Sequence, residues 1–248
     1  MIRRVDNSPG YVLHSRPWRE TSLIVEAFTR EHGRVGLVAR GVRRARSQFR
    51  GLLLPFRLLL VSWSGRGELP TLTGADAEGP VRSLGGRALF SGFYLNELLM
   101  KMLPRDDPHP ELFDDYRRAV ADLGSDGALD AVLRTFEKRL LDALGYGPAL
   151  DRAADTGAPV TPDQRYRYVP ERGPVEGSSA GEGVLVSGRT LLALAAGRIA
   201  GENEPARTEA RRLMRVILAP HLGPHPLGSR QLFRRPGPAD LENTEEAR

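Results

Sequence analysis

The sequence predicts an α+β protein, in which an N-terminal five-stranded barrel precedes an all-helical domain that carries an irregular insertion. Three observations predict this class. Residues 1–80 contain short segments rich in β-branched residues and separated by glycines. Residues 83–146 place apolar side chains at helical spacing. An apolar fraction of 40% beside 27% charged residues is typical of a soluble protein that forms a core.

Five segments predict the strands of the first domain, residues 1–80. They are 11–15, 21–29, 34–40, a long bent strand over 52–63 with Pro55 at an edge or bulge, and 68–73. Five short strands within about 75 residues are the content of a small barrel. The strand number fits an OB-fold, and strand propensity alone leaves an SH3-like barrel open.

Three amphipathic helices are predicted in the second domain, residues 81–146. The first ends at Pro104, the second begins after Asp107 as N-cap and ends at Gly124, and the third ends at Gly145. Three helices with short connections form a bundle.

The remaining chain divides into three parts. Residues 147–187 are rich in Pro, Gly and Ser and show only a weak strand signal at 165–169, so we expect an irregular insertion. Helical patterns at 189–199 and 209–218 predict that 188–235 packs back on the helical domain. Residues 236–248 have little apolar content and are predicted to be disordered.

Positive charge is concentrated in the N-terminal domain. Residues 1–80 hold 13 Arg and 7 acids, whereas residues 81–156 hold 10 basic residues and 13 acids. Because the middle of the chain is acidic, a general preference for arginine in this protein explains the pattern less well than a polyanionic partner does. A solvated loop of arginines is the alternative.

The residues that most catalytic and metal sites require are missing or scattered. There is no cysteine, so disulfides, thiolate zinc sites and cysteine nucleophiles are excluded. Neither Lys101 nor Lys138 follows a glycine, as a P-loop demands, and the five histidines are dispersed. We therefore expect no catalytic residues, no metal site, no cofactor and no enzymatic turnover. One local cluster could hold a metal, but acids at a proline-flanked helix start explain it better: Asp106, Asp107, His109, Glu111, Asp114 and Asp115.

The chain also lacks signs of a membrane protein. Residues 1–10 contain no apolar run of the signal-peptide kind, and the longest apolar stretch, 52–61, is short and contains Arg57. We expect a cytoplasmic protein with no membrane partner.

The stretch GYVLHSRPWRETSLIVEAFTREHGRVGLVARGVRR (10–44) resembles the start of the bacterial RecO proteins, which are mediators of recombination in DNA repair. Collinear similarity continues at 52–73, 91–116, 133–147, 166–173 and 218–235. The resemblance implies an N-terminal OB-fold, a central helical domain and a C-terminal module that binds zinc in many relatives. Here Ala153 stands where zinc-binding relatives carry a cysteine, so zinc is not expected.

The resemblance also implies a function. RecO proteins bind single- and double-stranded DNA and anneal complementary strands. With RecR they help RecA to load onto DNA coated by single-stranded-DNA-binding protein, whose acidic C-terminal tail they contact. We therefore expect these partners and a location at the nucleoid.

Arginine suits contact with phosphates, because its planar fork forms paired hydrogen bonds and stacks on bases. The predicted phosphate contacts flank the first turn, bracket the third strand and fill the loop that follows: Arg16, Arg19, Arg34, Arg40, Arg43, Arg44, Arg46 and Arg50. Trp18 and Phe49 lie beside arginines in predicted loops, so they are candidates for base stacking, with core positions as the alternative.

A partner site is predicted on the third helix. Spacing of i and i+4 places Arg134 and Lys138 on one face, next to Leu133 and Leu141 and followed by Arg139. An apolar groove with a cationic rim would suit an acidic peptide that ends in an aromatic residue. Plain surface charge is the alternative, and Arg207, Arg211 and Arg215 form a second basic stripe.

Two functions remain open at this point. The first is a DNA-binding and annealing mediator. The second is an adaptor that holds proteins together in a repair complex and binds little DNA itself.

Overall fold

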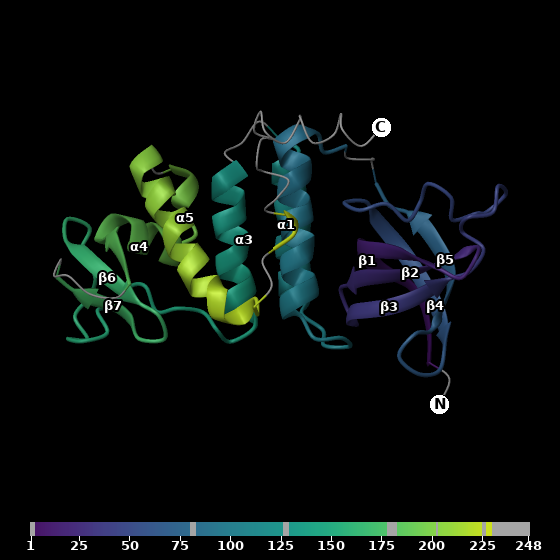
Figure 1. Cartoon of the computed structure of the whole chain (residues 1–248), viewed down its shortest axis with the longest axis horizontal. Coiled ribbons are helices and arrows are strands. Elements are labelled where there is room, and N and C mark those ends of the chain that lie inside the picture. Colours follow the sequence, from purple (N-terminus) through teal and green to yellow (C-terminus); the bar gives the residue numbers. More distant parts are fainter. Residues whose placement is uncertain are drawn as a thin grey trace, which may run out of the picture.

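The computed structural model describes residues 3–79, 83–125, 129–177, 183–201, 203–224 and 227–229. Within these ranges a barrel lies at one end of the molecule, a group of helices in the middle and a small sheet at the other end (Figure 1). The predicted disorder of residues 236–248 concerns residues outside the described ranges.

Five strands close the N-terminal barrel in the order β1-β2-β3-β5-β4. Their bounds are β1 (Arg3–Trp18), β2 (Ser22–Thr29), β3 (Gly33–Ala39), β4 (Leu58–Gly65) and β5 (Thr71–Ala77). All neighbours are antiparallel except β3 and β5, which meet in parallel at Val38 and Thr71. Strand number and order match the OB-fold, which confirms the predicted fold class and removes the SH3-like alternative.

Three strands differ from their predicted bounds. β5 spans Thr71–Ala77, later in the chain than the predicted 68–73. β1 is longer than predicted, because register shifts between Val5 and Ser8 and between Val12 and His14 let it bend from β4 to β2. The strand predicted over 52–63 begins only at Leu58. Pro55 lacks an N–H and the next residue, Phe56, has a left-handed backbone (φ 64°), so the chain turns before the strand starts.

Three helices follow the barrel: α1 (Gly86–Met102), α2 (Pro110–Leu123) and α3 (Leu129–Ala143). The second begins at Pro110 with His109 as N-cap, so the prediction of Asp107 as N-cap was wrong. Pro110 disfavours a helical backbone at His109, the residue before it, so the helix starts at Pro110, where no N–H is needed in the first turn.

The barrel and the helices share one hydrophobic core. Tyr11 and Phe28 of the barrel pack against Phe113 and Tyr116 of α2, with ring centroids 5.1–6.2 Å apart. Asn96 of α1 donates to the Leu13 carbonyl at 2.9 Å. These buried contacts hold the barrel at a fixed position on the helices.

The insertion is more regular than predicted. It contains an antiparallel sheet in the order β7-β6-β8, with β6 (Arg165–Val169), β7 (Gly173–Glu176) and β8 (Val184–Ser187). Only β6 was predicted, since the other two strands are four residues long and β7 also carries Gly and Pro. Tyr166 and Tyr168 bury their side chains in a second core that holds the sheet in place.

Both C-terminal helices exist near their predicted positions, but the first ends at Ala195 instead of 199 and the second begins at Glu204 instead of 209. They are α4 (Gly188–Ala195) and α5 (Glu204–Leu218), with single 3-10 turns η1 (Ile199–Gly201) and η2 (Ala219–His221). α5 lies beside α3 in the middle of the molecule and joins the helices to the small sheet (Figure 1).

Candidate nucleic-acid interface

A hollow of about 690 Å³ opens on the barrel between the β1–β2 turn and the end of β3. Its lining residues are Trp18, Arg19, Glu20, Thr21, Ser22, Val38, Arg40, Gly41 and Arg44. Four of the residues predicted to contact DNA therefore meet here, from three separate segments of the chain: Trp18, Arg19, Arg40 and Arg44. In OB-folds, ligands lie over the second and third strands beside the first turn, which is the place of this hollow.

The β1–β2 turn has a defined shape. Trp18 pairs with Ser22 at the end of the ladder, so only three residues form the turn. Arg19 is the first of them and has a left-handed backbone (φ 53°), which is uncommon for a residue with a side chain. The turn therefore fixes the positions of Trp18 and Arg19 on the rim.

The loop after β3 is fastened to this turn. The backbone N–H of Arg43 donates to the Thr21 carbonyl at 3.0 Å. Gly41 reverses the chain with φ 68°, and a Cβ on it would lie 3.7 Å from Cδ of Arg44. The loop thus brings Arg40 and Arg44 to the same hollow as Arg19.

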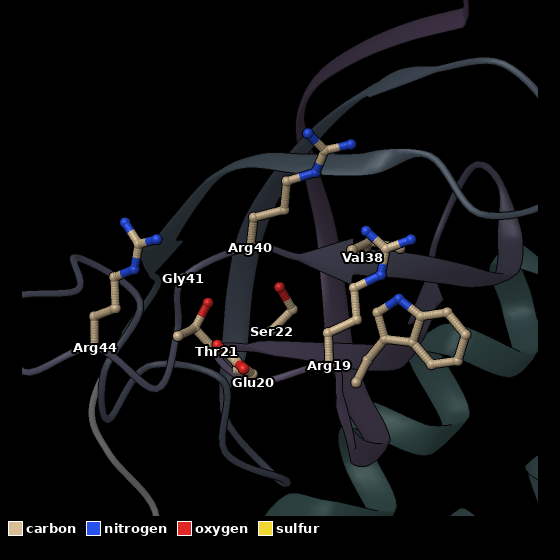
Figure 2. A pocket seen from close by; sticks show the side chains of 9 residues that line it. Arg19, Glu20, Thr21, Ser22, Val38, Arg40, Gly41 and Arg44 are labelled. Atoms are coloured by element: carbon tan, nitrogen blue, oxygen red, sulfur yellow. The ribbon is translucent and has the colours of Figure 1, made fainter.

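Figure 2 shows the three guanidinium groups of Arg19, Arg40 and Arg44 directed to the same side of the hollow, with Glu20 at the opposite side near the turn. All three arginines are exposed, and within the described part of the chain none forms an ion pair with a carboxylate. Glu20 is the acid among the nine lining residues. Unpaired guanidinium groups that face one space form a site for an anion such as phosphate.

Other predicted arginines lie near the hollow without lining it. Arg16 is exposed on β1, and Arg43, Arg46 and Arg50 are exposed in the loop after β3. Arg50 donates weakly to the Ala45 carbonyl at 3.4 Å. Their contact with phosphate stays a prediction.

Two residues predicted to contact DNA lie in the interior instead. The side chain of Arg34 is 15% exposed; it donates to the Glu26 carboxylate at 3.1 Å and to the Leu103 carbonyl at 3.0 Å. Phe49 is 7% exposed and packs in the barrel core. Arg34 therefore joins the barrel to the helical domain, and Phe49 anchors the loop, so neither is free to meet DNA.

The predicted peptide groove on α3 is not open. Leu133 and Leu141 are core residues at 7% and 0% exposure. Arg134 is 7% exposed and donates a hydrogen bond to the Glu137 carboxylate at 2.5 Å. The same carboxylate also accepts a hydrogen bond from the Tyr94 hydroxyl. The groove was predicted from one face of α3, but that face packs inside the protein.

The other basic residues of the predicted partner site, Lys138 and Arg139, lie on the more exposed side of α3. Lys138 pairs with Asp142 four residues later, and Arg139 is exposed. On α5, Arg207 pairs with Glu204, Arg211 lies within 4.0 Å of Asp130 and Glu204, and Arg215 is exposed. A role for Lys138 and Arg139 in partner binding stays a prediction.

The sequence reasoning missed the polar residues of the turn, namely Glu20, Thr21 and Ser22. The first two strands were predicted on either side of this turn, so pairing them in a hairpin could have placed these side chains beside Arg19. Val38 and Gly41 were missed for a different reason, since their part in the hollow depends on how the barrel closes.

The described residues contain neither a metal-binding cluster nor a membrane-spanning helix. No group of three or more His, Asp or Glu side chains lies close enough together to hold a metal ion. No helix in those ranges has the length and apolar character needed to cross a membrane.

Comparison with known proteins gives a consistent picture over most of the chain. Residues 2–80 match the family described as Recombination protein O N terminal, and residues 85–231 match Recombination protein O C terminal. The DNA repair protein RecO of Alkalilimnicola ehrlichii is 53% identical over 237 residues, covering 94% of this chain and 92% of its own. That of Nitrosococcus oceani is 52% identical over 232 residues, covering 93% of each chain. That of an Azoarcus species is 47% identical over 236 residues, covering 94% and 96%. With both halves matched and identities near one half, the chain belongs to the RecO family of DNA repair proteins.

Proposed function

We propose that this protein is a mediator of DNA repair and homologous recombination that binds single- and double-stranded DNA and anneals complementary strands. The observation that carries the proposal is the set of three unpaired guanidinium groups around the hollow of the OB barrel. Membership of the RecO family supports the role in DNA repair.

The chemistry of the hollow suits binding without reading of sequence. Arginine neutralises phosphates and forms hydrogen bonds with their oxygens, and phosphates are the same in every strand. Four more exposed arginines add positive charge on β1 and in the loop after β3: Arg16, Arg43, Arg46 and Arg50. A surface of this kind can hold strands of arbitrary sequence, as annealing requires.

The proposal includes protein partners. With RecR, the protein would help RecA to load onto DNA coated by single-stranded-DNA-binding protein and would contact the acidic tail of the latter. Family membership supports these partners, and the exposed cations Arg139 and Arg215 on the helices offer charge for an acidic tail. DNA binding implies that the protein works at the nucleoid, with no membrane partner.

The protein would act by binding and not by turnover. The hollow offers a phosphate the positive charge of Arg19, Arg40 and Arg44, which holds the anion without activating it.

The test is equilibrium binding of unrelated single-stranded oligonucleotides over a series of salt concentrations. A mediator should bind all sequences alike and weaken steeply as salt rises, because bound phosphates release counterions. An adaptor with little DNA binding of its own would show weak binding at every salt concentration, and that result would overturn the proposal. An annealing assay with complementary strands then tests the second step.

A further inference from the structure

We propose that the hollow on the barrel holds one unpaired nucleotide, with its base stacked on Trp18 and its phosphates held by Arg19, Arg40 and Arg44. This inference rests on the proposed DNA binding and adds which form of DNA the site selects. Duplex DNA would meet the same arginines through its backbone alone.

Size and shape favour a single nucleotide. The hollow measures about 690 Å³, within the range of about 300–1,000 Å³ that pockets for small ligands occupy. It lies between a three-residue turn and a loop tied to that turn by the bond from Arg43 to Thr21. A base in a duplex is paired and stacked on both sides, so it cannot enter such a space without leaving the helix.

Trp18 supplies the stacking surface. It is 39% exposed, whereas the other tryptophan, Trp63, is 1% exposed in the barrel core. The pairing of Trp18 with Ser22 holds its backbone at the end of β1, on the wall of the hollow that Arg19 also lines. An exposed indole beside several cations is the combination by which OB-folds hold single strands, through stacking and phosphate contact together.

The charges in the hollow orient the nucleotide. Figure 2 places the guanidinium groups of Arg19, Arg40 and Arg44 on one side and Glu20 on the other. Glu20 repels phosphate, so the backbone is confined to the arginine side. The base is then left facing the turn, where Thr21 and Ser22 offer hydroxyls to its polar edge.

One consequence concerns annealing. When the bound nucleotide pairs with a complementary strand, its base joins the duplex stack and its contact with the indole is lost. The site therefore holds unpaired DNA more tightly than the product of annealing, and pairing favours release.

The experiment compares two substitutions of Trp18 on two DNA forms. Trp18→Leu removes the ring and Trp18→Phe keeps one, while Tyr146→Leu is the matched control, because Tyr146 is an exposed aromatic (56%) remote from the hollow. Each variant is titrated with a single-stranded oligonucleotide and with a blunt duplex of equal length. We expect Trp18→Leu to weaken single-strand binding about ten-fold and duplex binding less than two-fold, with Trp18→Phe and Tyr146→Leu close to the unsubstituted protein.

Fluorescence gives a second readout that does not depend on affinity. Single strands should quench the emission of Trp18, duplex should not, and the quenching should vanish in Trp18→Phe, whose remaining Trp63 is buried. Circular dichroism and a melting curve establish that each variant is folded.

The outcomes separate the two proposals. If Trp18→Leu loses affinity equally for single strands and duplex, the nucleotide pocket is overturned and DNA binding stands. The same conclusion follows if its affinity for single strands is unchanged and single strands do not quench Trp18 in the unsubstituted protein. Failure of the unsubstituted protein to bind either form would overturn the proposed function itself.

Discussion

Arg34 on β3 and Glu26 on β2 form an ion pair with 3.1 Å between Nη1 and Oε2, at the junction of the barrel with the helices. Glu26 is 7% exposed and also pairs with Arg105, which follows α1. Arg34 adds a bond to the Leu103 carbonyl at the end of α1. One carboxylate and two arginines thus connect a strand, its neighbour and the first helix.

The first prediction follows from this cluster. Arg34→Ala removes hydrogen bonds to a buried carboxylate and a carbonyl, which should lower the free energy of unfolding by about 2–3 kcal/mol. Urea denaturation of the unsubstituted protein and of Arg34→Ala at neutral pH measures this loss of stability. Arg40→Ala is the matched control, because Arg40 is exposed on the same strand edge and should change stability by no more than about 0.5 kcal/mol. Equal stability of the two variants would show that the cluster does not support the fold.

The same arginine shows where sequence reasoning reached its limit. Arg34 was grouped with Arg40 because both flank one predicted strand, and both were expected to meet DNA. Glu26 faces Arg34 from the neighbouring strand β2, and the approach of α1 adds Arg105 and the Leu103 carbonyl. Partners as distant in sequence as Leu103 and Arg105 leave no local pattern.

The helical face of α3 shows a related limit. Apolar spacing located the helix correctly, and it also identified Leu133 and Leu141 as one stripe. Spacing does not show how much of the helix is covered, however, and Arg134 lies buried beside Glu137. By contrast, Trp18, Arg19, Arg40 and Arg44 could be found from the sequence, because they flank predicted turns and loops, which lie on the surface.

The second prediction concerns metal. Elemental analysis of the purified protein should find no stoichiometric zinc, and a chelator should leave the melting temperature unchanged. The chain has no cysteine, and Ala153, where the resemblance implies a cysteine in zinc-binding relatives, is 1% exposed in an apolar cluster. The thiolates of a usual structural zinc site are therefore missing. One tightly held zinc per chain would contradict this account.

The third prediction concerns pH and the contact of the small sheet with α5. The Glu209 carboxylate accepts from the Ser187 hydroxyl at 2.6 Å, the Ser187 N–H at 3.0 Å and the Thr190 hydroxyl at 2.8 Å. Burial alone would raise the pKa of Glu209, but these bonds and the charge of Arg165 outweigh it and lower the pKa below 4.5. The folded state thus favours the ionised form.

The sign of the effect follows from this lowered pKa. The stabilisation is fully present above the ordinary pKa of glutamate and is lost as the pH falls through the lower value of the folded state. Glu209→Gln should therefore cost about 1–2 kcal/mol at pH 7, and its difference from the unsubstituted protein should shrink as the pH falls below 4. Urea denaturation at both pH values measures this. A difference independent of pH would mean that the charge of Glu209 does not matter.

The last prediction concerns the loop after β3. Replacing Arg43, Arg44 and Arg46 together by alanine should weaken DNA binding at low salt, because these exposed arginines are predicted to contact phosphates. The slope of log K against log salt should flatten by about 0.7 for each lost contact on single strands. Stability should change by no more than about 0.5 kcal/mol, since the loop is anchored by Phe49 and by the backbone of Arg43.

A matched control removes the same charge elsewhere. Arg152, Arg172 and Arg198 are exposed and, within the described residues, form no ion pair, and they lie away from the barrel in the insertion and after α4. Replacing these three arginines by alanine lowers the net charge by the same amount as the loop variant. The salt slope should stay unchanged, because a direct phosphate contact depends on where the arginine lies, whereas a general attraction depends only on the total charge. Equal flattening in both triple variants would show that DNA responds to net charge alone. An unchanged slope in the loop variant would exclude the loop from the phosphate path and leave Arg19 and Arg40 as its remaining cations at the hollow.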